Sequence, residues 1–325
     1  MKANFNLKRD FLYLGFSLLV LFVFMSCDQL GQKTISKKPD TVTDKVYKAG
    51  NVSFTMKPIK KVEAGTLGTA DIADNGIHKV NLDAYFISET EVTQELYKEV
   101  MGSDSNPSQN LGEANLPVDT VTWFNAVLFA NALTKKTGLG EAECVYYSDP
   151  QCTKVYTQED AQKAITSYFS GKIENFPYQN MNKKGFRLPT EAEWEWAAKG
   201  GKEDKWAGTD DKNTLIEYAW YNFDDSVNFG NAKSHPVKGK KPNGYGLYDM
   251  SGNVYEWCWD WHTAKPAKDD VENNPAGPAT TTTGGKVYRG GFVIANSDAT
   301  RNAWSAGDPP MNDYKFCGIR LVCRP

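Results

Sequence analysis

The sequence predicts an α+β fold with short helices, small antiparallel sheets and many loops. Nine tryptophans and sixteen tyrosines among 325 residues favour a β-rich, loop-rich domain with aromatic clusters over a helix bundle. Short segments that alternate apolar and polar residues predict strands, and threonines before amphipathic segments predict helix N-caps. The hydrophobic content of 40% is ample for a sizeable core. The formal net charge of −3 gives no indication of nucleic-acid binding.

Residues 1–26 are predicted to be a signal peptide and not part of the fold. A basic start precedes an apolar run over residues 11–25, which is too short for a comfortable membrane span. A small residue then precedes Cys27, as in bacterial lipoproteins, so Cys27 is the expected lipidation site; an ordinary signal peptide or an uncleaved anchor is the alternative. Residues 27–50 are polar and predict a flexible tether, and residues 51–325 predict one domain.

Two helices are predicted early in the domain. Residues 80–87 alternate as a strand does. Thr93 is then placed to cap a short helix with apolar residues on one face. Thr122 is placed to cap a second helix, which is expected to end at Gly138.

Further helix signals lie in the middle of the chain. Thr190 and Glu193 form a capping-box pattern at the start of a helix that Gly200 ends. Residues 160–168 are a candidate for another short helix. Residues 262–285 are rich in Pro, Asn, Thr and Gly, so we expect a long surface loop there.

The C-terminal tail has the composition of a binding surface. Val287–Arg289 at its start and Gly318–Val322 at its end alternate as strands do. Small polar and aromatic residues without regular pattern lie between them. Aromatic rings give rigid contact area and short polar groups give adaptable hydrogen bonds, so the tail predicts an adaptable binding surface. An ordinary surface loop with a few core aromatics is the alternative.

Five cysteines follow the predicted lipidation site, and an exported protein can form disulfides. Cys144 and Cys152 are close enough in sequence to pair across a loop. Cys317 and Cys323 have an even spacing on or beside the last predicted strand, so we expect them to face the same side. Cys258 is expected to be a small buried hydrophobe. No pair has CxxC spacing, which argues against a zinc site.

Five blocks of the sequence resemble the formylglycine-generating-enzyme domain, which is the sulfatase-modifying-factor family. They occur in the family's order over about residues 50–325 and read EVTQELY, GFRLPTEAEWEWAAKGG, NGYGLYDMSGNVYEWCWDW, YRGG and GIRLVCRP. The resemblance implies a single C-type-lectin-like domain with two short helices, a small twisted antiparallel sheet and many loops. This domain occurs in enzymes and in non-enzymes, so the site must decide the function.

The resemblance argues against catalysis at the family's reaction site. The family's enzymes use two cysteines after the RGG block for copper-dependent oxidation of a substrate cysteine. The matching positions here are Ala295 and Thr300, which cannot form a thiolate or bind copper through sulfur. A related branch builds an iron site with histidines, but His78, His235 and His262 are not at ligand spacing. We therefore expect no catalytic residues and no required cofactor.

The tail also resembles the variable region of lipoproteins that retroelements diversify. In these proteins an error-prone copy of an RNA template replaces the 3′ end of the gene. Their tails run from a GG block to GFRLV, which corresponds here to Gly290–Gly291 and Gly318–Val322. The residue types from Phe292 to Phe316 are nearly those that mutated asparagine codons yield.

This resemblance implies a design that separates stability from binding. Strands fix both ends of the tail, and core aromatics such as Trp194, Trp196 and Trp257 stabilise the domain elsewhere. The expected solvent-facing ligand-binding residues are Phe292, Ile294, Asn296, Asp298, Asn302, Trp304, Asp308, Asn312, Asp313, Tyr314 and Phe316. Trp304 and Tyr314 are expected to be the energetic anchors.

The resemblance also implies a candidate calcium site. Asp249 and Glu256, with the carbonyls of Gly252 and Val254, match oxygen ligands that hold calcium in the family's enzymes. Hard oxygen donors at such spacing suit calcium. The alternative is that Glu256 bonds backbone amides and that no metal is present.

These observations predict a non-catalytic, surface-displayed lipoprotein whose tail binds a ligand, which we expect to be a protein. Its other expected partner is the outer membrane, through the lipid anchor. Two alternatives stay open: an oxidase of the formylglycine-generating type, and a structural envelope lipoprotein without a diversified site. Copper binding with oxygen consumption would identify the oxidase. Isolate sequences that vary outside residues 292–316 would identify the structural protein.

Overall fold

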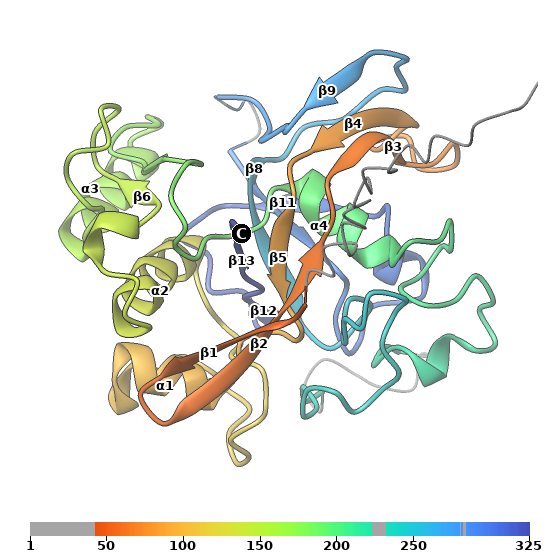
Figure 1. Cartoon of the computed structure of the whole chain (residues 1–325), viewed down its shortest axis with the longest axis horizontal. Coiled ribbons are helices and arrows are strands. Elements are labelled where there is room, and N and C mark those ends of the chain that lie inside the picture. Colours follow the sequence, from red (N-terminus) through yellow and green to blue (C-terminus); the bar gives the residue numbers. More distant parts are fainter. Residues whose placement is uncertain (1–42, 223–231, 280, 282–283) are drawn as a thin grey trace, which may run out of the picture. The chain divides into compact units, whose positions relative to one another are not determined.

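The structure is a computed structural model, and its compact unit runs from Val42 to Pro325 (Figure 1). The residues that it describes are 43–222, 232–279, 281 and 284–325. The predicted signal peptide, the lipidation site Cys27 and most of the predicted tether lie outside these residues. Within the described ranges, no helix has the length and apolar character that a membrane crossing requires.

Short strands form four small sheets in the described part of the chain. The strands are β1 Lys45–Ala49, β2 Val52–Ile59, β3 Val62–Leu67, β4 His78–Leu82, β5 Tyr85–Ser88, β6 Tyr146–Tyr147, β7 Tyr178–Gln179, β8 Tyr255–Trp261, β9 Val271–Asn273, β10 Lys286–Arg289, β11 Ala306–Asp308, β12 Cys317–Gly318 and β13 Val322–Cys323. The sheet orders are β1-β2-β5-β13, β11-β10-β8-β12, β3-β4-β9 and β6-β7. Only β12 with β8 and β9 with β4 pair in parallel among these strands.

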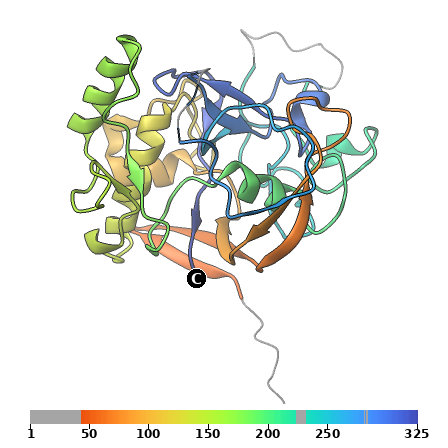
Figure 2. The same ribbon diagram turned by 90° about the horizontal axis from the view of Figure 1, so that it is seen from above.

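Four α-helices lie in the described ranges, where the family resemblance implied two. They are α1 Gln94–Met101, α2 Trp123–Lys136, α3 Gln158–Phe169 and α4 Glu191–Lys199. Four short 3-10 turns are η1 Ser103–Ser105, η2 Glu141–Glu143, η3 Leu215–Glu217 and η4 Asp298–Thr300. In Figures 1 and 2, α1, α2 and α3 lie together, with α1 against β1 and β2, and α4 lies among the strands. The predicted α+β class with many loops is confirmed.

The predicted helix starts are confirmed by their hydrogen bonds. The hydroxyl oxygen of Thr93 accepts a hydrogen bond from the backbone amide of Leu96 at 3.2 Å. The hydroxyl oxygen of Thr122 accepts one from the backbone amide of Asn125 at 3.1 Å. Thr190 and Glu193 form the reciprocal capping box. The second helix ends at Lys136, slightly before the predicted Gly138.

Two predicted strands are divided in the structure. The strand expected over residues 80–87 becomes β4 and β5, which belong to different sheets. The strand expected over Gly318–Val322 becomes β12 and β13, because the chain crosses from one four-stranded sheet to the other around Arg320. Cys317 and Cys323 therefore lie in different sheets, and the five described cysteines are free thiols.

The domain begins earlier than predicted. Residues 45–49 are not tether but strand β1, which pairs with β2 from Lys45 opposite Met56 to Ala49 opposite Val52. The predicted surface loop 262–285 likewise contains a strand, β9, which pairs in parallel with β4 and satisfies backbone groups at its edge.

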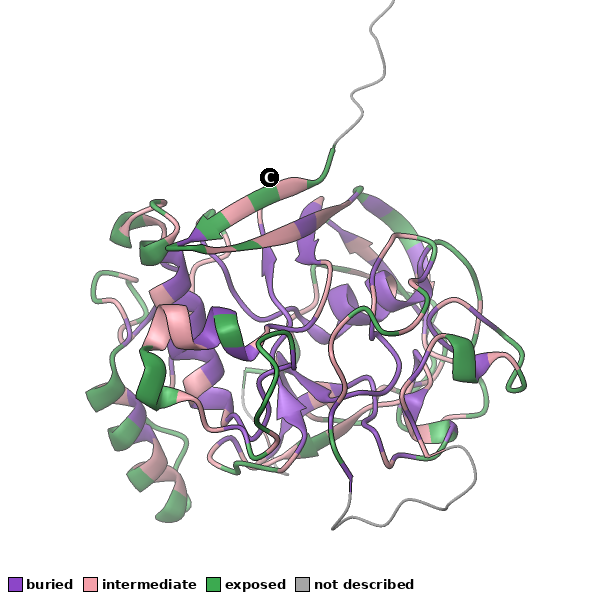
Figure 3. Ribbon diagram, turned by 90° about the horizontal axis from the view of Figure 1, so that it is seen from below, coloured by how far each residue is buried: buried purple, intermediate pink, exposed green. Residues whose placement is uncertain are grey.

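Two large clusters of buried hydrophobic residues and a smaller one around Trp206 form the core of the described chain. Figure 3 colours the ribbon of buried residues purple. The first includes Trp123 and Trp257, and the second, which includes Trp194, packs α4 against β3, β4, β8 and β10. Trp194 and Trp257 are 0% exposed, as predicted for core aromatics. Trp196 is only partly buried and packs against the second cluster from outside, so its prediction as a core residue is wrong.

Candidate functional site

Strand β8 holds both ends of the C-terminal tail. β10 lies antiparallel to β8, with Tyr288 opposite Trp257. β12 lies along the other edge of β8 and runs parallel to it, with Cys317 opposite Tyr255. The tail therefore leaves β8 on one side and returns to it on the other. This arrangement fixes the backbone at both ends, as the sequence predicted.

Two glycines turn the chain out of β10. Gly290 and Gly291 have φ angles of 93° and 77°, which residues other than glycine rarely adopt. A Cβ atom on Gly291 would lie 2.5 Å from Cγ2 of Thr300 and 2.9 Å from the carbonyl of Ala299. The turn therefore needs glycine both for its backbone angle and for close packing against the following segment.

Aromatic residues of the tail pack around Tyr255 of β8 and form a cluster with it. The ring of Tyr255 lies 4.4 Å from Tyr288, 4.7 Å from Phe292, 5.9 Å from Trp304 and 6.3 Å from Tyr314, measured between centroids. Burial raises the pKa of Tyr255, so its hydroxyl stays neutral. One residue of the frame thus contacts rings from the start, middle and end of the tail.

The structure divides the predicted site residues by exposure. Five are exposed: Asn296, Asp298, Asn312, Asp313 and Tyr314. Three are partly buried: Ile294, Trp304 and Asp308. Three are buried, with exposed fractions of 8%, 3% and 0%: Phe292, Asn302 and Phe316. The expectation that all eleven face solvent is therefore wrong for the last three.

Packing and backbone contacts explain the three buried residues. The rings of Phe292 and Phe316 lie 5.6 Å apart inside the aromatic cluster. The amide of Asn302 donates to the carbonyl of Lys205 at 2.7 Å, and its Nδ2 donates to the carbonyl of Asp204 at 2.9 Å. These residues support the tail from within, and the exposed set forms its surface.

The surface of the tail is acidic and aromatic. Tyr314 is 39% exposed, and Trp304 is partly exposed, so both predicted anchors present ring area to solvent while contacting Tyr255. Asp308 accepts a hydrogen bond from Nδ2 of Asn312 at 3.1 Å. Burial raises the pKa of Asp308. This mixture can contact a partner through rings and hydrogen bonds.

Arg289 is a supporting residue that the sequence reasoning missed. Its guanidinium is 0% exposed and donates to the carbonyls of Trp304 and Asn302, each at 2.9 Å. It also forms ion pairs with Glu191 at 3.4 Å and with Glu195 at 2.5 Å. Burial opposes its charge, yet these carboxylates raise the pKa of Arg289. The only signal in the sequence was an arginine within the alternating segment before two glycines.

The two positions that carry cysteines in the family's enzymes lie within the tail. Ala295 is 5% exposed and donates its amide to the carbonyl of Phe292 at 2.8 Å. Thr300 is 0% exposed and donates its hydroxyl to the carbonyl of Ser297 at 2.9 Å. Cys317 is buried, and burial raises its pKa well above the ordinary value, which disfavours the reactive thiolate.

The calcium site stays a prediction, and both of its carboxylates have partners within the protein. The carboxylate of Glu256 accepts from Nε of Arg320 at 2.9 Å and 2.8 Å and from Nε1 of Trp194 at 2.5 Å. The guanidinium therefore supplies the positive charge, and side chains take the place of the expected backbone partners. Oδ2 of Asp249 accepts the amide of Lys238 at 2.9 Å. No group of three or more acidic, histidine or cysteine side chains that could hold a metal occurs in the described part of the chain.

Residues 32–325 match the sulfatase-modifying factor enzyme 1-like domain. The chain belongs to this family. Chaperone protein LppX of Paenibacillus barcinonensis is 34% identical over 214 residues, which cover 62% of this chain and 71% of that protein. The formylglycine-generating enzyme of Streptomyces coelicolor is 37% identical over 119 residues, which cover 34% of this chain and 37% of the enzyme.

Two solved structures share the fold. Treponema denticola variable protein 1 is 39% identical with a TM-score of 0.73, and the match covers 88% of this chain and 100% of that one. PvdO from Pseudomonas aeruginosa is 20% identical with a TM-score of 0.58, and the match covers 86% and 98%. The predicted family and the predicted similarity to a variable protein are confirmed.

Proposed function

We propose that this family member is a non-catalytic binding protein that presents the surface of its tail to a protein ligand. The observation that carries the proposal is the division of the tail into buried and exposed sets. Buried rings pack on Tyr255, and the buried guanidinium of Arg289 holds the backbone of the tail through the carbonyl of Trp304. Eight of the predicted site residues keep exposed or partly exposed side chains. The similarity to a variable protein supports this proposal.

Diversification by a retroelement is consistent with this division. Substitutions of exposed side chains usually change stability by less than about 0.5 kcal/mol. Residues such as Asn296, Asp298 and Asn312 can therefore change without unfolding the domain. Phe292 and Phe316 cannot, because each is part of the aromatic cluster.

The chemistry at the family's reaction site supports a non-catalytic role. Ala295 and Thr300 offer no sulfur for copper or for a mixed disulfide with a substrate. Burial raises the pKa of Cys258 and Cys317 well above the ordinary value, and raises that of Cys323 to about 11. These thiols are thus poor nucleophiles at neutral pH.

The proposed location is the cell surface, with the membrane reached through a lipid on Cys27. This proposal rests on the sequence before residue 43, where a basic and apolar start precedes that cysteine. Metabolic labelling with a radioactive fatty acid tests it. Label should enter the wild-type protein and be lost in Cys27→Ala.

A display experiment tests the binding function. One library randomises the eight exposed or partly exposed tail positions. A matched library randomises eight exposed positions away from the tail: Val46, Lys48, Lys60, Glu63, Phe169, Lys172, Glu174 and Tyr178. Both are selected for binding to lysozyme. We expect the tail library to yield specific binders far more often, and equal yields would contradict the proposal.

The matches to formylglycine-generating enzymes make an oxidase the second candidate. It predicts copper-dependent oxygen consumption with a cysteine-containing peptide. We expect none from the wild-type protein, with Ala295 and Thr300 in place. Oxygen consumption above that of a copper-only control would contradict the non-catalytic proposal.

A further inference from the structure

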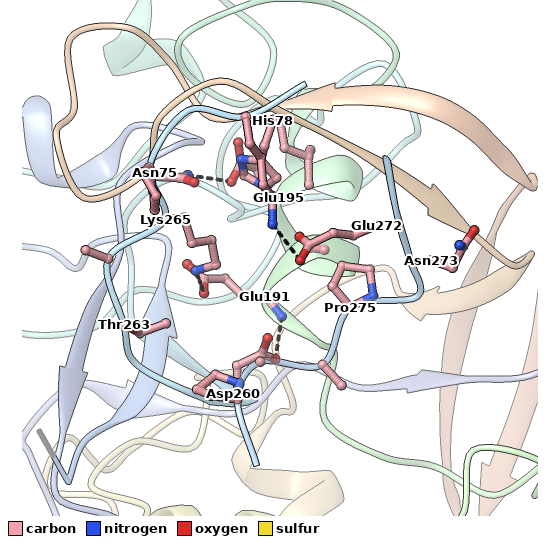
Figure 4. Close-up of a pocket in the computed structure, with 18 residues that line it drawn as sticks. Asn75, His78, Glu191, Glu195, Asp260, Thr263, Lys265, Glu272, Asn273 and Pro275 are labelled. Carbon is pink, nitrogen blue, oxygen red and sulfur yellow. Dashed lines mark hydrogen bonds and ion pairs between the residues drawn. The ribbon is translucent and has the colours of Figure 1, made fainter. Parts of the chain in front are cut away.

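A cavity lies between α4, β4 and the segment 263–278, and none of the predicted tail site residues lines it (Figure 4). Its volume is about 500 Å³, which is within the range of small-ligand sites. Its polar side chains include Asn75, His78, Glu191, Glu195, Asp260 and Lys265. Lys268 and Glu272, which form an ion pair with each other, also line it. Leu67, Ala192 and several prolines form its apolar wall. The proposed binding function of the tail does not use it.

The buried charges of this cavity leave one carboxylate without an ion-pair partner. Glu191 pairs with Lys265 and Arg289, and Glu195 pairs with Arg289. Asp260 is 2% exposed and accepts the amide of Glu191 at 2.8 Å. It makes no ion pair with any cation in the described part of the chain. A buried carboxylate without a paired cation is costly, so a cation entering the cavity would stabilise it.

An amide oxygen in the cavity wall also lacks a partner. Asn75 is 1% exposed, and its Nδ2 donates to Glu195 at 2.8 Å and to the carbonyl of Ala303 at 2.9 Å. These acceptors fix the orientation of the amide, and they leave its Oδ1 without a hydrogen bond. Buried polar atoms without partners are uncommon, and this one can only accept a hydrogen bond.

His78 adds a third acceptor to the wall. Its Nδ1 lies 2.8 Å from the carbonyl of Gly76, so Nδ1 carries the proton. In the neutral ring, Nε2 is then an acceptor. The cavity thus offers acceptors from Asp260, Asn75 and His78, and a matching ligand must supply donors.

An ammonium group of the protein already binds a carboxylate of the cavity wall. The ammonium of Lys265 lies on the carboxylate of Glu191 inside the cavity (Figure 4). Backbone hydrogen bonds hold this lysine in place, from its amide to Asp74 at 2.9 Å and from Gly76 to its carbonyl at 2.8 Å. One ammonium is therefore already bound by the chain, next to the unpaired Asp260.

We propose that this cavity binds a small ligand with a primary ammonium group, which lies beside Lys265 and contacts Asp260. An ammonium carries three donors and one positive charge. It can pair with the Asp260 carboxylate and satisfy Oδ1 of Asn75 or Nε2 of His78. A neutral polyol supplies donors but leaves the charge of Asp260 uncompensated.

Binding is expected to depend on pH through Asp260. Burial, together with the neighbouring Glu191 carboxylate, raises the pKa of Asp260 to about 7. Lys265, from the segment after β8, and Lys286, from β10, act in the opposite direction. Asp260 is therefore ionised above about pH 7, and affinity for a cation should rise from pH 6 to pH 8.

The test is an isothermal titration calorimetry experiment in which the folded protein is titrated with 1,4-diaminobutane and, separately, with 1,4-butanediol. We expect saturable one-to-one binding of the diamine at pH 8, weaker binding at pH 6, and none of the diol. Asp260→Asn should weaken diamine binding by about tenfold or more and remove its pH dependence. Glu174→Gln removes an exposed carboxylate that does not line the cavity and should leave binding unchanged.

Asn75→Leu provides a second variant, since it removes the unpaired acceptor without changing charge. It should weaken diamine binding and leave the pH dependence in place. Thermal unfolding of each variant verifies that the domain is folded. Equal binding of the diol, unchanged affinity in folded Asp260→Asn, or no saturable diamine binding at millimolar concentrations would each overturn the proposal.

Discussion

Arg289 donates a hydrogen bond to the carbonyl of Trp304 at 2.9 Å, across the fifteen positions that separate them in the chain. The same guanidinium pairs with Glu191 and Glu195 of α4. The helix that the capping box starts is therefore connected to the middle of the tail through one buried cation. This connection explains how a tail with few regular strands keeps a defined backbone.

Replacing Arg289 by methionine should destabilise the domain strongly. The change leaves the carboxylates of Glu191 and Glu195 without their shared partner, and breaking a buried ion pair costs about 3–5 kcal/mol. Urea unfolding of the two proteins measures the difference. Arg324→Met is the control, because its ion pair with Asp83 is partly exposed and is worth about 1 kcal/mol or less. Equal losses in the two variants would contradict this role of Arg289.

Tyr255→Ala should also be costly. Removing this ring leaves a cavity among Tyr288, Phe292 and Trp304, and such deletions of buried aromatic side chains cost about 3–5 kcal/mol. The free energy of unfolding by urea is again the measurement. Tyr178→Ala removes a ring that is 46% exposed and serves as the matched control. A loss no larger than that of the control would show that the tail does not depend on Tyr255.

Exposed and buried positions of the tail should respond differently to substitution. Asn312→Ala changes an exposed side chain, so we expect a change within about 0.5 kcal/mol. Asn302→Leu removes the donor to the carbonyl of Asp204, and leaving this partly buried carbonyl unpaired costs about 1–3 kcal/mol. Chemical unfolding distinguishes the two. Similar effects at both positions would contradict the division of the tail by burial.

The stability of the domain should depend on pH through Asp249. Burial raises the pKa of Asp249 from 3.8 to about 6 in the folded state. The folded protein therefore binds this proton more tightly than the unfolded chain, so the contribution of Asp249 to stability falls as pH rises from about 4 to 6. Asp249→Asn removes this titration and retains an oxygen that can accept the amide of Lys238.

Unfolding of both proteins between pH 4 and pH 8 measures this effect. The stability of Asp249→Asn relative to wild type should increase up to about pH 6 and then stay level. A difference that is constant across this range would show that Asp249 does not titrate between the two states.

Local signals explain why much of the frame could be predicted. Thr93, Thr122 and Thr190 cap helices through contacts within three residues, so the sequence contains the whole interaction. The family blocks likewise predicted the fold class and the position of the tail. The division of the strand around Arg320 was not predicted, because it depends on Glu256 and Ser88, which are distant in sequence.

Long-range contacts explain what sequence reasoning missed in the tail and the cavity. Asn302 looked like an exposed polar residue, but the carbonyl that binds it belongs to Asp204. Asp260 and Asn75 are almost two hundred positions apart, and only the folded chain brings them to one cavity. Polar residues of this kind give no periodic signal in the sequence.

The central claim is that exposed tail side chains can be replaced on a fixed frame. Sequencing the 3′ end of this gene from many isolates tests it most directly. We predict substitutions concentrated at the exposed and partly exposed site residues between Ile294 and Tyr314, with Phe292, Asn302 and Phe316 unchanged. Substitutions scattered along the gene, or as frequent at those three buried positions, would contradict the account.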